Sequence, residues 1–134
     1  MSDPAPAPAF ASASAGARLD RLLGPDGRTV IVALDHALAT GQAAGLDDPA
    51  GVLAEVAEAG ADAAILTPGA ARLRAGAAAN LPWLLTADYY ATSADAGMPG
   101  DAELHGVLWG AEHAASLGAD GIKCLWIHGQ TDAE

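Results

Sequence analysis

The sequence has 134 residues, a length that suits one ordinary domain, and 51% of them are hydrophobic. Its formal net charge of −11 argues against attraction to nucleic acid or to anionic lipid, because no basic cluster offsets it locally. The single cysteine, Cys124, excludes an intrachain disulfide and fits a reducing compartment. No apolar run approaches the roughly 18 residues of a membrane helix. We therefore expect a globular, cytoplasmic protein that binds neither nucleic acid nor a membrane.

The first residues, MSDPAPAPAFASASAGA, differ in composition from the rest of the chain. They are rich in Pro, Ala and Ser, and they lack the positively charged region and apolar core of a signal peptide. We predict a disordered tail over residues 1–17 and one domain over residues 18–134.

Helices and strands are predicted to alternate after the tail. A short amphipathic helix lies within residues 17–28, and the β-branched apolar run TVIVAL, residues 29–34, is typical of a strand buried on both faces. Asp48 and Pro49 begin a helix that ends at Gly60. The pattern then predicts a strand over 61–67, a short helix over 68–78, a strand over 81–88, a polar loop over 89–100, a helix over 102–118 and a strand over 119–129.

The predicted alternation indicates an α/β fold. The similar segments AGAD and LGAD precede the second and the fourth strand and suggest a repeated βα unit. Alternating strands and helices favour parallel pairing with right-handed crossovers. Four strands make either a small doubly wound sheet or half of a (β/α)8 barrel, since a full barrel takes about 250 residues.

Polar residues gather where the predicted strands end. In chain order these are Asp35, His36, Thr67, Asp88 and His128. Parallel α/β folds bind ligands at the carboxyl ends of their strands, so the positions suit a site. Polar residues also occur there simply because the chain leaves the core, and this structural role is the alternative for Asp88 and His128.

Asp35 stands out among these residues because it directly follows the apolar run. Partial burial at that position suits a carboxylate to proton transfer. The alternative is that Asp35 only caps nearby backbone N–H groups.

Other candidate residues give weaker signals. His105 and His113 are too far apart for a metalloprotease motif, and we expect both on the solvated face of a helix, with no metal bound. Cys124 is expected to be a small core residue. A strand lysine inside a barrel can form a Schiff base, but we expect Lys123 to extend toward solvent.

Three segments together resemble a known family: VIVALDHALATGQAAGLDDP, AGADAAILTPGAAR and AASLGADGIKCLWIHG. They look like the archaeal-type class I fructose-bisphosphate aldolases, a group that also includes aminodideoxyheptulosonate synthases and an autoinducer-2 phosphate thiolase. The family signature is a strand that runs into Asp-His-Gly, followed by a Gly-rich loop and a Gly-Leu-x-x-Pro-like helix start. The segments occur in the right order between about Arg18 and about Gln130.

The resemblance implies a (β/α)8 barrel that makes or breaks carbon–carbon bonds through a lysine Schiff base. The family's substrates are small phosphorylated ketoses and aldehydes, and no metal or other cofactor is required. On this basis Asp35 is the expected catalytic residue, assisting proton transfer. The expected substrate-binding residues are His36, Ala37, Asp88 and His128.

The sequence departs from the family in two ways. Ala37 replaces the glycine that follows Asp-His, which crowds the approach of the backbone to a ligand. The family's Schiff-base lysine lies on strand six, its tyrosine on or after strand five, and its phosphate loops after strands seven and eight. Lys123, on the fourth predicted strand, does not correspond to that lysine.

We therefore expect the N-terminal half of an aldolase-type barrel, about four βα units long, with little or no aldolase activity on its own. Its open sheet edge favours a homo-oligomer or a partner subunit that completes the barrel. The alternative is a non-catalytic half-barrel, or one half of a split enzyme whose partner supplies the lysine.

Overall fold

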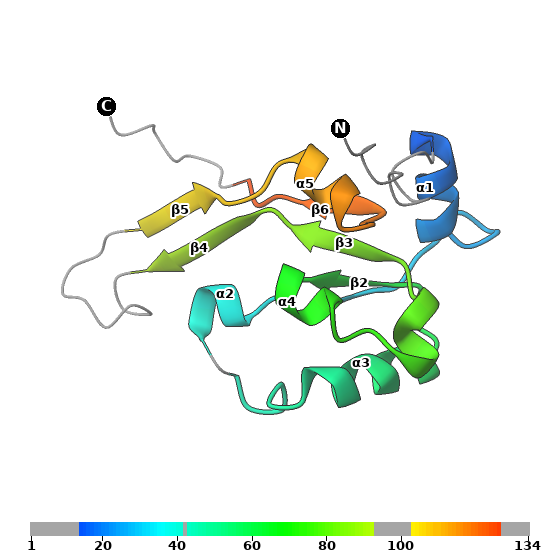
Figure 1. Ribbon diagram of the computed structural model, residues 1–134, viewed down its shortest axis with the longest axis horizontal. Coiled ribbons are helices and arrows are strands. Elements are labelled where there is room, and N and C mark those ends of the chain that lie inside the picture. Colours follow the sequence, from blue (N-terminus) through cyan, green and yellow to red (C-terminus); the bar gives the residue numbers. More distant parts are fainter. Residues whose placement is uncertain (1–13, 42, 93–102, 127–134) are drawn as a thin grey trace, which may run out of the picture.

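The computed structural model describes residues 14–41, 43–92 and 103–126 of the chain. A parallel sheet with the strand order β1-β2-β3-β6 forms its centre (Figure 1). The strands are β1 (Ile31–Ala33), β2 (Ala63–Leu66), β3 (Trp83–Thr86) and β6 (Gly121–Lys123). The helices are α1 (Ala15–Leu22), α2 (Ala37–Thr40), α3 (Pro49–Glu58), α4 (Pro68–Ala71), the 3₁₀ helix η2 (Gly76–Asn80) and α5 (Ala111–Ser116). The predicted α/β fold with four parallel strands is confirmed.

The helix boundaries follow from local capping. Asp48 precedes α3 and accepts a hydrogen bond from the Gly51 N–H at 3.1 Å, while Pro49 fills the first helical position. Gly60 has φ 85° just after the helix, a left-handed conformation that favours glycine. α1 begins at Ala15, rather than at residue 18 where we expected the domain to begin. The tail prediction for residues 1–13 lies outside the described residues.

The repeated Gly-Ala-Asp segments have a shared structural role. Asp62, before β2, accepts a hydrogen bond from the Val30 N–H at 2.7 Å. Asp120, before β6, accepts one from the Trp83 N–H at 3.1 Å and pairs with Arg21 of α1 at 3.1 Å. Each aspartate therefore links the amino end of its strand to the neighbouring strand, which explains the repeat.

The core lies between β2, β3 and the helices. Its buried residues are Leu53, Ala64, Leu66, Ala78, Leu81, Trp83, Leu85, Ala114 and Ala119. β1 was expected to be buried on both faces, and this prediction is wrong. It is an edge strand that pairs only with β2, so Ile31 stays 37% exposed.

A β-hairpin replaces part of the predicted loop and helix. β4 (Asp88–Thr92) pairs antiparallel with β5 (Glu103–Val107), and the hairpin extends away from β3 with α2 in contact with β4 (Figure 1). Only the end of the predicted helix over 102–118 is helical. Gly106 disfavours a helix interior, and aromatic residues such as Tyr89 favour strands. Gly106 pairs with Tyr89, and a Cβ at this position would lie 2.7 Å from the ring.

No helix within the described residues is long and apolar enough to cross a membrane.

Leu53 of α3 is fully buried in the core. The Leu53→Ala variant should therefore have a free energy of unfolding about 2–5 kcal/mol lower than that of the unmodified chain. Leu19→Ala is the matched control, because Leu19 lies in α1 and is 53% exposed, and it should change that energy by about 0.5 kcal/mol or less. Urea unfolding followed by circular dichroism measures both. Equal losses would contradict the assigned core.

Candidate active site at the carboxyl ends of the strands

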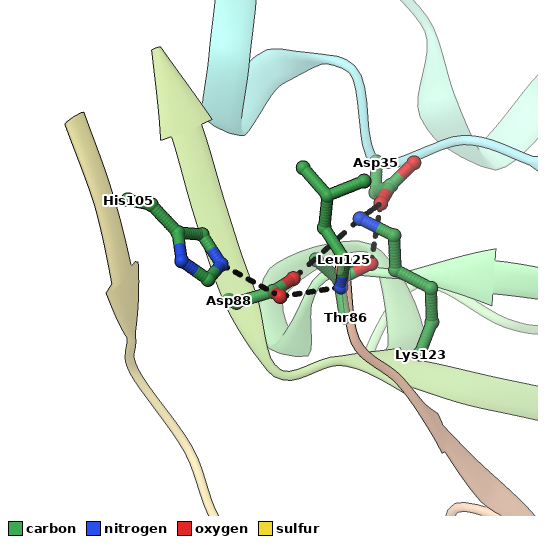
Figure 2. A network of polar contacts seen from close by, with 6 residues as sticks. All are labelled: Asp35, Thr86, Asp88, His105, Lys123 and Leu125. Carbon is green, nitrogen blue, oxygen red and sulfur yellow. Dashed lines mark hydrogen bonds and ion pairs between the residues drawn. The ribbon is translucent and has the colours of Figure 1, made fainter. Parts of the chain in front are cut away.

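Charged side chains from β1, β6 and β4 meet at one edge of the sheet. Asp35 follows β1, Lys123 ends β6, and Asp88 begins β4 directly after β3. The Lys123 Nζ lies 3.4 Å from Asp35 Oδ2 and 3.6 Å from Asp88 Oδ1 (Figure 2). Parallel strands place their carboxyl ends at the same edge, so residues distant in the sequence come together there. The structure thus joins two residues that we predicted, Asp35 and Asp88, through a lysine that we did not.

Lys123 points into this cluster, which corrects the expectation that it extends toward solvent. Its strand neighbour in register is Thr86 of β3, so both side chains lie on the same face of the sheet. Thr86 is buried and its Oγ1 donates a hydrogen bond to Asp35 Oδ2 at 2.5 Å. Neither residue was predicted for the site. The alternation of Thr86 and Asp88 along the third strand was the available signal.

Asp88 is the most buried charged residue of the cluster, at 2% exposure. Its Oδ2 accepts a hydrogen bond from the Leu125 N–H at 2.5 Å and lies 3.2 Å from His105 Nε2. Burial alone would raise the pKa of Asp88. The Leu125 N–H, His105 and the Lys123 charge together outweigh burial and hold this pKa below its ordinary value. The buried Oδ1 has no hydrogen-bond partner among the described residues.

His105 reaches Asp88 because of the hairpin. The register pairs Asp88 with Val107 and Tyr90 with His105, so Asp88 and His105 are diagonal neighbours across the two strands. The prediction that His105 lies on a solvated helix face is therefore wrong. The tautomer of the ring decides whether Nε2 donates to the carboxylate.

A small cavity of about 190 Å³ opens beside the charged cluster. It is lined by Asp35, His36, Leu38, Ala39, Thr86, Asp88, Tyr89, Tyr90, Lys123 and Leu125. Ala37 instead borders a separate apolar cavity of about 370 Å³ between α2, α3 and α4. His128 lies outside the described residues. Of the predicted substrate-binding residues, His36 and Asp88 therefore share the cavity with Asp35.

Two further residue predictions concern cysteine and metal ligands. Cys124 follows β6 and is exposed, so the expectation that it is a core residue is wrong. Within the part of the chain that the structure describes, no group of three or more His, Cys, Asp or Glu side chains is placed to hold a metal ion.

The fold resembles that of archaeal fructose-1,6-bisphosphate aldolases. A solved archaeal enzyme with its catalytic Lys covalently bound to the carbinolamine intermediate of the substrate matches with a TM-score of 0.61 and 23% identity, over 81% of this chain and 43% of that one. A second archaeal fructose 1,6-bisphosphate aldolase matches with a TM-score of 0.61 and 24% identity, over 81% and 42%. A Schiff-base-forming fructose-1,6-bisphosphate aldolase matches with a TM-score of 0.59 and 23% identity, over 81% of this chain and 43% of that one.

These comparisons establish an aldolase-like fold, and they confirm the expected resemblance at that level. This chain spans less than half the length of the solved aldolases. No family model and no curated protein sequence matches it.

The lowered pKa of Asp88 predicts a pH dependence of stability. A carboxylate whose folded pKa is depressed stabilises the fold above its unfolded pKa, about 4, and this contribution is lost as the pH falls through the folded pKa. The free energy of unfolding should therefore fall less steeply in Asp88→Asn than in the unmodified chain as the pH is lowered from about 5 to about 3. Urea unfolding at several pH values measures the slopes. Glu58→Gln, an exposed control, should keep the original slope, and an unchanged slope in Asp88→Asn would contradict the assignment.

Proposed function

We propose that this chain forms the N-terminal half of a (β/α)8 barrel, about four βα units, and takes part in Schiff-base aldolase chemistry on small phosphorylated ketoses and aldehydes. The observation that carries the proposal is the pairing of Asp35 with Lys123 at the strand ends of an aldolase-like sheet. Substrate sites of parallel α/β folds occupy this edge.

Asp35 is the proposed proton-transfer residue. In a Schiff-base aldolase an amine adds to the ketone and water leaves, giving an imine. The carbon–carbon bond then breaks, its electron pair moves toward the imine, and a hydroxyl of the departing aldehyde gives up its proton. Asp35 borders the cavity and is held by the Thr86 hydroxyl and by Lys123, so a carboxylate oxygen is positioned to accept that proton.

Lys123 is proposed to act as an ion-pairing group rather than as the nucleophile. It is the one lysine in the printed sequence. Its ammonium contacts two carboxylates, whereas attack on a carbonyl requires the neutral amine. We therefore place the Schiff-base lysine in the second half of the barrel, on a partner subunit or on a longer chain.

A second candidate function is that of a non-catalytic half-barrel that binds another copy or a different subunit. The observation that favours it is exposed apolar surface at both edges of the sheet. Ile31 lies on the edge strand β1, and Trp126, shortly after β6, is 90% exposed. Apolar side chains at open edges suit pairing with further strands.

The isolated chain should form no Schiff base, because its lysine is ion-paired. Fructose 1,6-bisphosphate and borohydride should give no reduced adduct on Lys123 by mass spectrometry. Lys123→Met is the matched control, because any adduct that this variant still gives must lie at another residue. An adduct present in the unmodified chain and absent from this variant would make Lys123 the nucleophile and contradict its proposed role.

The complete assembly, isolated with any polypeptide that accompanies the chain in its source cells, should cleave fructose 1,6-bisphosphate. Asp35→Asn should lower kcat by roughly 100-fold or more, the range of acid–base catalysis. Asp26→Asn removes a carboxylate outside the site and should leave kcat unchanged. An assembly without cleavage activity would contradict the proposed function, and unchanged kcat in Asp35→Asn would remove Asp35 from catalysis.

A further inference from the structure

The segment 34–39, which carries Asp35, borders two cavities of different character. Four of its residues border the cavity of about 190 Å³ beside the charged cluster. The other two, Leu34 and Ala37, border the apolar cavity of about 370 Å³ between α2, α3 and α4. The segment is therefore a wall shared by a charged cavity and an apolar one.

The apolar cavity offers no charge to a ligand. Leu46, Val52 and Leu73 contribute apolar side chains, and none of the described residues that line it is charged. The one polar side chain among these lining residues, that of Thr67, already caps α4, because its Oγ1 accepts a hydrogen bond from the Ala70 N–H at 3.2 Å. A charged group that entered would lose its hydration without gaining a partner. The lining therefore selects an uncharged, apolar ligand.

The volume of the cavity sets the size of that ligand. An apolar cavity of about 150 Å³ accommodates benzene, and pockets for small molecules span roughly 300–1,000 Å³. At about 370 Å³ the cavity matches a compact molecule of about ten carbon atoms, such as two fused rings. Its lining comes from α2, α3, α4 and the segments that flank them, so it surrounds a ligand of this size from several sides.

We propose that the apolar cavity is a binding site for a small uncharged molecule with an apolar body of about ten carbon atoms, and that this ligand stabilises the segment 34–39 beside Asp35. The inference goes beyond the proposed function, because this cavity is separate from the ion pairs at the strand ends and needs no aldolase chemistry.

The wall that the ligand contacts has little stability of its own. α2 is four residues long, and its N-cap residue, His36, makes no side-chain capping hydrogen bond among the described residues. So short a helix gains little from its own hydrogen bonds. The Leu38 N–H donates to the Asp35 carbonyl at 3.1 Å, and the Ala39 N–H donates to the His36 carbonyl at 3.0 Å. A ligand that binds only the ordered wall shifts the equilibrium toward it by mass action.

The first test compares three probes of the same ring size by NMR on the unmodified, ¹⁵N-labelled chain. 2-Naphthol, which is uncharged at neutral pH, should shift the amide resonances of Val52 and Leu73 to saturation. 2-Naphthoate and 1-naphthylmethylammonium should bind there at least about tenfold more weakly, because each would bring a charge to an apolar lining. One of these ions is an anion and the other a cation, so the net charge of −11 cannot account for weak binding of both. No saturable shift with 2-naphthol, or equal or tighter binding of either ion at these amides, would overturn the inference.

A variant then assigns the binding to this cavity. Leu73 borders the cavity and is 45% exposed, so Leu73→Asp adds a carboxylate to the lining at a position that solvent reaches. It should weaken 2-naphthol binding by about tenfold or more. Leu19→Asp makes the same change on α1, at a residue that is 53% exposed and outside the cavity, and should leave the affinity unchanged. Undiminished binding in a folded Leu73→Asp chain would overturn the assignment.

Hydrogen exchange tests the stabilisation of the wall. If opening of the wall abolishes the site, exchange of the Leu38 and Ala39 amides slows by the factor 1 + [L]/Kd, about tenfold at a 2-naphthol concentration ten times Kd. The Leu23 amide, which donates to the Leu19 carbonyl at the end of α1, should keep its exchange rate. Unchanged exchange at Leu38 and Ala39 in the saturated chain would overturn this part of the inference.

The assembly isolated from the source cells separates a small molecule from a polypeptide as the occupant. It should bind 2-naphthol as the isolated chain does. Binding by the isolated chain but not by the assembly would assign the cavity to a segment of an accompanying polypeptide and contradict the inference. Cleavage of fructose 1,6-bisphosphate by the same assembly is an independent result, so failure of the inference and failure of the proposed function are distinguishable.

Discussion

The site depends on one ammonium group shared by two carboxylates. Lys123 lies between Asp35 and Asp88, and through them it connects the ends of β1 and β6 with the start of the β4–β5 hairpin. Without this cation, two carboxylates would face the same small cavity, and Asp88 is nearly fully buried. Removing one partner of a buried ion pair is costly because the remaining charge stays desolvated. Hydrogen bonds from Thr86 and the Leu125 amide complete the arrangement.

Local sequence patterns were sufficient for the sheet and for two members of the site. The apolar runs predicted all four parallel strands, and the capping residues Asp48 and Pro49 predicted α3. Strand direction fixes which end of a parallel α/β sheet binds ligands, and this places Asp35 and Asp88 at that edge together with other polar residues such as Thr67. The resemblance to the aldolase family then singles out Asp35 and Asp88 among them.

The remaining site residues depend on pairing that local patterns do not reveal. The side chain of Lys123 faces inward because β6 pairs with β3 in a register that aligns it with Thr86, and a short apolar run does not indicate its register. The helical spacing of Leu104, Leu108 and Ala111 also predicts a helix that runs through β5. The pairing of Tyr89 with Gly106 outweighs that weak periodicity, and His105 reaches Asp88 only through this hairpin.

The exposure of the charged side chains also has an electrostatic consequence. The exposed fraction of the side chain falls from 31% for Lys123 to 13% for Asp35 and 2% for Asp88. The ammonium therefore lies at the solvent-exposed end of the network, and Asp88 lies at the buried end. Water near Lys123 raises the local dielectric and weakens its attraction to both carboxylates. Any molecule that covers the strand ends therefore strengthens these ion pairs without touching them, because it lowers the dielectric around a charge network that this chain already assembles.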